Sequence, residues 1–236
     1  MKNIKKISVF LAAVMLCASL LAGCGINKEA TLITINGGED TISLGYGNFL
    51  AHFTQAEYEV AYLDYFGSSM WSEDMFSTGN TAEQDVKDNI LEQIEVQYLL
   101  KQHAADYGVE LTADDESAIE AAADKFMEDN SDELIEQMGA EKQYIVDLLT
   151  YETYAIRVQK AIYAEADVTI TDEEIEEAGD DYDEATLIEE KQSDYYDGIV
   201  DGFKEDIDWE VDEKQWAKVN FNYHYSMVET EEETAE

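Results

Sequence analysis

The side chains that most often carry out chemistry in proteins are few in this chain and far apart. It has two cysteines, Cys17 and Cys24, and three histidines, His52, His103 and His224. The histidines fall on different predicted elements, so we interpret each as an ordinary surface or helix histidine rather than as a base or a metal ligand. The sequence therefore predicts no catalytic residue, no metal site and no cofactor.

Cys24 follows a segment with the layout of an export signal. Three lysines near the start precede an apolar run over residues 7–20, which is typical of a secretory signal peptide and too short for a membrane span. The phrase Leu21-Ala22-Gly23-Cys24 resembles the bacterial lipobox. That resemblance implies that residues 1–23 are removed and that Cys24 carries a lipid anchor, although an ordinary signal peptide with a chance cysteine is the alternative. With Cys17 discarded and Cys24 lipidated, no thiol remains for a disulfide or a nucleophile.

The net charge of the chain limits the classes of partner that it can bind. Acidic residues outnumber basic ones by 55 to 14, which gives a net charge of −41. Such a field repels phosphate backbones, so we expect no nucleic-acid partner. The acidic run over residues 180–184 lacks the glycine turn and later glutamate of a calcium loop. We interpret the acids as a solvated surface, and buffering of divalent cations is the alternative.

Two elements precede the middle of the chain. Residues 31–36 and 41–44 are β-branched runs joined by a Gly-Gly turn, which predicts a hairpin. An apolar stripe at helical spacing then predicts a helix from Tyr46 to about Phe66. Tyr58, Tyr62 and Tyr65 form a second stripe on that helix. They suit either packing at the edge of the core or a half-wet surface that binds other polypeptides.

The segment over residues 67–80 is rich in Gly and Ser, yet it carries Met70, Trp71, Met75 and Phe76. A loop this apolar must either tuck under the fold or present an adhesive surface. Methionine and aromatic side chains adapt to many partners, which is what an unselective peptide binder needs. The candidate client-binding residues are therefore Tyr58, Tyr62, Tyr65, Phe66, Met70, Trp71, Met75 and Phe76.

The longest helical pattern runs from Thr81 to Thr112 and predicts the central core helix. Gly108 stands where a left-handed cap residue belongs, and Val109 is placed to fold back onto the last turn. Thr112 then restarts the chain as the N-cap of the next helix. This corner, preceded by a hairpin and an aromatic helix, resembles the N-terminal chaperone domain of the SurA/PrsA foldases.

The resemblance covers residues 31–228 and implies a chaperone core without the family's inserted isomerase domain. Thr171 with Glu174 predicts a capping box, the point at which the family inserts its parvulin prolyl isomerase, but another helical pattern starts almost at once. None of the three histidines belongs to a parvulin motif. We therefore expect no isomerase activity, and residual activity stays open as an alternative.

The last part of the chain predicts a strand. Residues 219–227 alternate apolar and polar side chains, and we expect this strand to complete the N-terminal hairpin. Residues 24–30 are interpreted as a tether and residues 229–236 as an acidic, disordered tail. The predicted fold is one globular unit, mainly α with a small antiparallel sheet.

These features predict a lipid-anchored, extracytoplasmic chaperone that holds unfolded, newly exported polypeptides at the cell membrane. A surface lipoprotein with a structural or adhesive role is the alternative, favoured if the aromatic loop is buried. A solute-binding protein is disfavoured, because it needs alternating strands and helices in two lobes.

Overall fold

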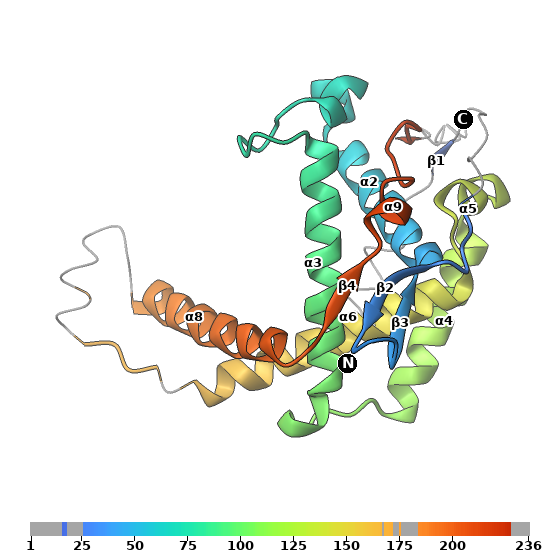
Figure 1. Ribbon diagram of the computed structural model, residues 1–236. Helices are drawn as coiled ribbons and strands as arrows, with labels where there is room; N and C mark the ends of the chain where they lie inside the picture. The colour runs from blue at the N-terminus through green and yellow to red at the C-terminus, as the bar shows by residue number, and fades with distance from the viewer. Residues whose placement is uncertain (1–15, 18–25, 167, 172–174, 176–183, 228–236) are drawn as a thin grey trace, which may run out of the picture. The chain divides into compact units, whose positions relative to one another are not determined.

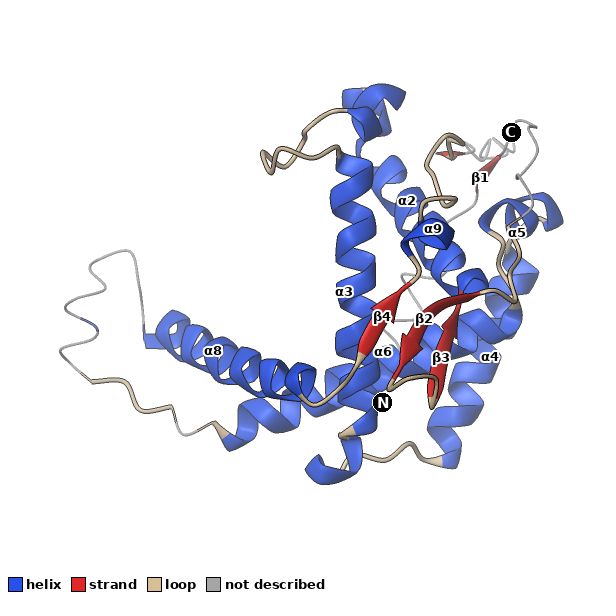
Figure 2. Cartoon of the chain, in the orientation of Figure 1, coloured by secondary structure: helices blue, strands red, loops and turns tan. Residues whose placement is uncertain are grey.

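The computed structural model describes residues 16–17, 26–166, 168–171, 175 and 184–227. Helices make up most of the described chain, together with a small antiparallel sheet (Figures 1 and 2). The predicted fold class is therefore confirmed. The signal peptide apart from residues 16–17, the Cys24 anchor, the Glu174 half of the capping box and the acidic tail all lie outside the described residues.

The sheet has three strands in the order β3-β2-β4, with both neighbours antiparallel to β2. They are β2 (Thr31–Ile35), β3 (Asp40–Ser43) and β4 (Trp209–Val211), and they lie side by side in Figure 1. The register shifts between Thr31 and Ile33, as at a β-bulge, and both Leu32 and Ile33 are fully buried. The C-terminal part of the chain thus completes the predicted hairpin.

The strand that completes the sheet is β4, and the prediction that residues 219–227 would do so is wrong. Within them only β5 (Ser226–Met227) is a strand, and it pairs with β1 (Leu16–Cys17), inside the predicted signal peptide. Val219, Phe221 and Tyr225 are nevertheless buried, as the alternation predicted. Side chains of neighbouring helices bind the backbone of this segment in place of a strand ladder.

Helix α2 (Leu44–Phe66) follows β3 directly. Ser43 caps it, because the Ser43 hydroxyl accepts a hydrogen bond from the Tyr46 amide at 3.2 Å. A Cβ at Gly45 would lie 2.2 Å from the Tyr144 hydroxyl, so only glycine allows this close packing. The predicted tether is partly docked here, because Lys28 and Ala30 accept hydrogen bonds from the Gly45 and Leu44 amides.

The predicted central helix is divided in two. Helix α3 runs over Ala82–Gln102, and the 3-10 turn η2 over Ala104–Tyr107 follows it. Gly108 adopts the predicted left-handed conformation with φ 64°, and the Val109 amide donates to the Ala104 carbonyl at 2.9 Å. The predicted corner is therefore confirmed, and α4 (Ala113–Asp129) begins directly after Thr112.

The remaining elements follow the predicted order. Ser131 caps α5 (Asp132–Met138), which ends at the left-handed Gly139. The longer helices are α6 (Lys142–Glu165) and α8 (Glu184–Glu205), and α9 (Glu213–Trp216) comes after β4. The 3-10 turn η1 (Ser68–Ser72) lies in the segment between α2 and α3.

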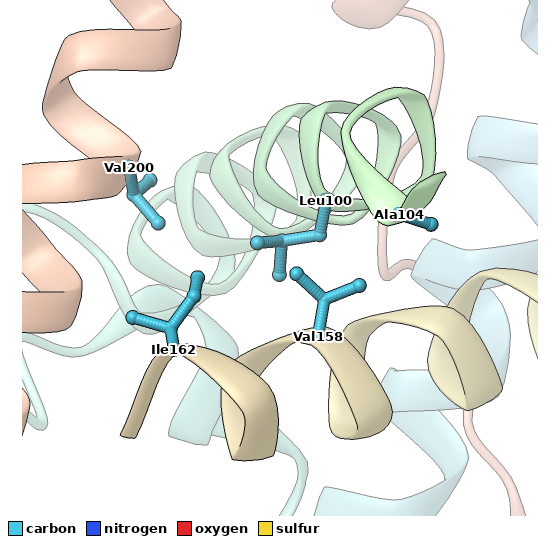
Figure 3. Packing of buried hydrophobic residues seen from close by; sticks show 5 residues of the cluster. All are labelled: Leu100, Ala104, Val158, Ile162 and Val200. Atoms are coloured by element: carbon cyan, nitrogen blue, oxygen red, sulfur yellow. The ribbon is translucent and has the colours of Figure 1, made fainter. Parts of the chain in front are cut away.

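The chain forms two compact units, where the sequence predicted one. Among the described residues, the first unit comprises 16–17, 26–93, 113–148 and 208–227, and the second comprises 94–112, 149–166, 168–171, 175 and 184–207. The second has its own core, in which Leu100 and Ala104 meet Val158 and Ile162 of α6 and Val200 of α8 (Figure 3). Helices α3 and α6 each contribute residues to both units.

Candidate client-binding surface

Aromatic side chains lie exposed at the C-terminal end of α2 and in the loop after it, within the first unit. Tyr62, Tyr65, Phe66 and Phe76 have exposed fractions of 46%, 83%, 55% and 45%. The half-buried Tyr58 links two of them, because its ring lies 6.1 Å from that of Tyr62 and 6.3 Å from that of Phe76. Tyr62 in turn lies 6.3 Å from Phe66. We call Tyr58, Tyr62, Tyr65, Phe66 and Phe76 the aromatic surface.

Two residues of the predicted surface lie inside the protein, and this corrects the prediction for them. Met70 and Trp71 are 2% and 4% exposed. The η1 turn directs Trp71 inward, where its ring packs edge-on against Phe221 at 4.6 Å and against Tyr58 at 6.0 Å. Met75 is half-buried. The loop therefore does both things that its composition allowed: it tucks two side chains under the fold and leaves Phe76 outside.

The loop that carries Phe76 is closed by hydrogen bonds rather than loose. The Ala82 amide donates to the Glu73 carbonyl at 2.8 Å, which joins the two ends of the loop. Inside it, the Asp74 carboxylate accepts from the amides of Thr78 and Gly79, at 3.0 and 3.1 Å. Asp85, in the first turn of α3, accepts from the side chains of Thr78 and Asn80. Phe76 is thus held at a defined place beside Tyr58.

A buried carboxylate anchors the aromatic surface from below. The Glu59 side chain is fully buried, and its Oε1 accepts hydrogen bonds from Trp71 Nε1 at 2.6 Å, His224 Nδ1 at 2.9 Å and Gln55 Nε2 at 3.0 Å. Its Oε2 accepts from the Tyr225 amide. These bonds offset the cost of burying a charge, and they tie η1 and the C-terminal segment to α2.

Gln55 and His52 extend this network along α2. Gln55 Nε2 also donates to the Tyr223 carbonyl, and Gln55 Oε1 lies 3.0 Å from His52 Nδ1. Because the amide nitrogen uses both hydrogens as donors, the amide oxygen receives the proton on His52 Nδ1. Burial lowers the pKa of His52, while the hydrogen bond that His52 donates to Gln55 and the charge of Glu59 oppose that shift.

Sequence reasoning treated the histidines separately and missed this network. His52 and His224 are far apart in sequence, yet His52 bonds Gln55, His224 bonds Glu59, and these two polar side chains bond each other. One available signal was the helical spacing of His52, Gln55 and Glu59, which places three polar residues along one side of an apolar helix. The third histidine, His103, stacks on Phe203 at 3.7 Å in the second unit.

A buried lysine binds the start of the same C-terminal segment. Lys87 of α3 is 6% exposed, and its Nζ donates to the carbonyls of Trp216 at 3.2 Å and Val219 at 2.7 Å. The same ammonium lies 5.2 Å from the centre of the Trp216 ring. Burial lowers the pKa of Lys87, and the neighbouring acids Glu83, Asp88 and Glu213 oppose this shift.

Among the described residues, no three His, Cys, Asp or Glu side chains gather as a metal would require. The helices of the described chain include none that is long and apolar enough to cross a membrane.

Comparisons with protein-family models, with curated proteins and with solved structures found no match. What the aromatic surface offers is noncovalent contact with apolar groups.

Proposed function

We propose that this protein is a lipid-anchored, extracytoplasmic chaperone that holds unfolded exported polypeptides on the aromatic surface. The observation that supports this proposal is the cluster of exposed rings from α2 and the loop after it. Contiguous exposed apolar surface is uncommon on a monomeric protein and marks a site of interaction. A lipid anchor on Cys24, as the lipobox implies, would hold the protein at the cell membrane.

The chemistry of the rings suits loose and unselective binding. Three of the five are tyrosines, whose rings contact apolar side chains while their hydroxyls stay in water. Each contact contributes little, so a client gains affinity from several rings and still dissociates. The acidic surface keeps the complexes in solution. Binding of this kind uses no catalytic residue, and the proposal is that of a holding chaperone rather than an enzyme.

The test is suppression of aggregation by the purified processed protein. An unfolded exported polypeptide is diluted into buffer with increasing amounts of the protein, and light scattering is followed. We expect suppression at near-stoichiometric ratios. The variant with Tyr62, Tyr65, Phe66 and Phe76 all changed to Ser should lose most of it, because the loss of about 1.4 kcal/mol of binding free energy already weakens affinity tenfold.

A matched control uses exposed apolar residues of the other unit. Ile156 and Tyr195 are 43% and 41% exposed, so the variant Ile156→Ser with Tyr195→Ser removes comparable side chains elsewhere. It should suppress aggregation as the unmodified protein does. No suppression by the folded, unmodified protein would refute the proposal. Acceleration of a proline-limited refolding reaction would instead support the residual isomerase activity implied by the family resemblance.

The second candidate is a surface lipoprotein that uses the same rings to bind one folded partner. It is favoured by the burial of Met70 and Trp71, which leaves a smaller and more rigidly held surface than the sequence predicted. The two candidates differ in the state of the partner. A chaperone suppresses aggregation of several unrelated unfolded polypeptides, whereas a dedicated adhesion protein does not.

A further inference from the structure

We infer that the aromatic surface selects apolar segments flanked by lysine or arginine. This inference rests on the proposed function and specifies its substrate class. It is carried by two observations on the first unit: the distribution of charge around the rings and the absence of any cation of the described chain over them.

The segment of the chain that carries the aromatic surface has charges of a single sign. Between Phe53 and Val86 the sequence contains seven acidic residues and no lysine or arginine. Asp64 directly precedes Tyr65 in the sequence of α2, and Glu73 precedes Phe76 in the loop by three residues; both side chains are exposed. Among the described residues, no hydrogen bond or ion pair engages either of these two carboxylates.

The other acids near the rings are already engaged or partly buried. Glu59 and Asp74 accept the hydrogen bonds described above, and Asp85 does so at the base of the loop. Glu57 is half-buried, and burial raises its pKa. Glu83, the seventh acid, is also half-buried, and its charge acts on the buried ammonium of Lys87. Asp64 and Glu73 are therefore the carboxylates that a bound cation can reach without disturbing the fold.

The exposed rings have their own affinity for cations. Elsewhere in the described chain, lysines take up ring faces: Lys87 lies over Trp216 and Lys101 lies 4.5 Å from the ring centre of Tyr151. No lysine or arginine of the described residues lies over Tyr62, Tyr65, Phe66 or Phe76. A lysine or arginine from a client can occupy such a face and gain about 0.5–1 kcal/mol at an exposed site.

Charge also distinguishes between the possible ligands of the aromatic surface. A second copy of this chain would bring a further net charge of −41 to the surface, and an anionic membrane would be repelled in the same way. A cationic apolar segment is attracted over a distance set by the salt concentration, about 10 Å at 0.1 M. It then places its apolar side chains on the rings and its cations near Asp64 and Glu73.

The experiment measures binding of three fluorescent peptides to the purified processed protein by anisotropy. The peptides share one apolar core and carry flanking Lys, Ser or Glu residues. At low salt we expect the Lys-flanked peptide to bind about tenfold or more tightly than the Glu-flanked peptide, with a ratio that falls as salt rises. The variant Asp64→Asn with Glu73→Gln should shrink the ratio several-fold and leave binding of the Ser-flanked peptide unchanged.

The controls separate this inference from the proposed function. The variant Asp201→Asn with Glu205→Gln removes two exposed acids from the second unit and should leave the ratio unchanged; an equal effect would show that total charge, not this surface, sets the preference, and would overturn the inference. Equal binding of all three peptides would overturn it while the proposed function stands. Binding of none of them would count against both. Ring-dependent binding to zwitterionic lipid vesicles, without peptide binding, would assign the surface to lipid instead.

Discussion

Glu59 shows how one residue determines whether the aromatic surface exists. Its carboxylate accepts hydrogen bonds from Trp71 on η1, from His224 and Tyr225 on the C-terminal segment, and from Gln55 on its own helix. With Trp71 held inward, Tyr58 gains a ring partner on the loop side. The exposed rings of α2 are thus supported by a buried charge.

Replacing Glu59 by Leu should destabilise the protein strongly. The change leaves the Trp71 indole and the Tyr225 amide buried without an acceptor, which costs about 3 kcal/mol. Unfolding in urea measures the change in free energy. Asp64→Leu, an exposed acid on the same helix, is the matched control and should cost less than about 1 kcal/mol. Equal effects would mean that Glu59 is not needed for the fold.

His52 should make the fold sensitive to mild acid. Burial lowers its pKa below the usual 6.5 in the folded state, so the unfolded chain takes up the proton first as pH falls. The contribution of neutral His52 to stability is therefore fully present above pH 6.5 and is lost progressively as the pH falls below that value. His52→Asn keeps a donor for Gln55 and removes this titration.

The measurement compares melting temperatures at about pH 7.5 and pH 5.5, a window that contains the ordinary histidine pKa. The unmodified protein should lose more stability over this window than His52→Asn does. His103→Asn, a change at the histidine that stacks on Phe203, should behave like the unmodified protein. The same loss in all three proteins would contradict a role for His52.

The loop between α2 and α3 behaves as a structural element of its own, because hydrogen bonds to carboxylates hold it closed. Asp74 and Asp85 bind it from within and from the start of α3. A loop ordered before binding loses less entropy when a client docks. Phe76 can then act with Tyr58 as one contact rather than as a separate, mobile ring.

Asp85→Ala should loosen this loop without unfolding the protein. Thr78 and Asn80 lose their acceptor, but the loop is exposed, so water replaces it at a cost of about 1 kcal/mol. Cleavage next to Phe76 by a protease specific for aromatic residues should become faster. Asp88→Ala, one turn further along α3, serves as the control and should be cleaved at the original rate. Unchanged cleavage in Asp85→Ala would contradict the proposed closure.

Local signals explain why most helix ends were predictable. Ser131 and Gly139 bound α5, and Gly108 ends the turn after α3, because caps depend only on neighbouring residues. Residues 219–225 show where such reasoning fails. Their alternation correctly predicted which side chains are buried, yet Glu59, Gln55 and Lys87 bind the backbone that a strand partner would have bound. Those partners are remote in sequence.

The candidate surface was only partly predictable, because local spacing shows which residues share a helix face but not which of them are buried by remote parts of the chain. Helical spacing placed Tyr58, Tyr62 and Tyr65 on one stripe, and the structure leaves two of these three rings exposed. Composition alone could not show that Met70 and Trp71 are buried while Phe76 is exposed, because this difference depends on the η1 turn and on the Glu59 acceptor. The convergence of His52 and His224 is likewise a tertiary feature.

At the scale of the whole molecule, the chain distributes its apolar residues over two cores. Composition predicted one unit because it counts apolar residues without showing which helices share them. The cluster around Leu100, Val158 and Val200 is the hydrophobic core of the second unit, while the aromatic surface belongs to the first unit. Client binding and the second core are therefore independent by this account, and changes in the second unit that keep the fold should leave client binding intact.

Site-specific photo-crosslinking tests the central claim most directly. A benzophenone amino acid replaces Tyr65 in one version of the protein and Tyr195, exposed in the second unit, in another. Each version is irradiated with the same exported polypeptide, once unfolded and once folded. The account predicts strong crosslinking from position 65 to the unfolded form only, and little from position 195. Equal yields from the two positions, or crosslinking to the folded form alone, would contradict it.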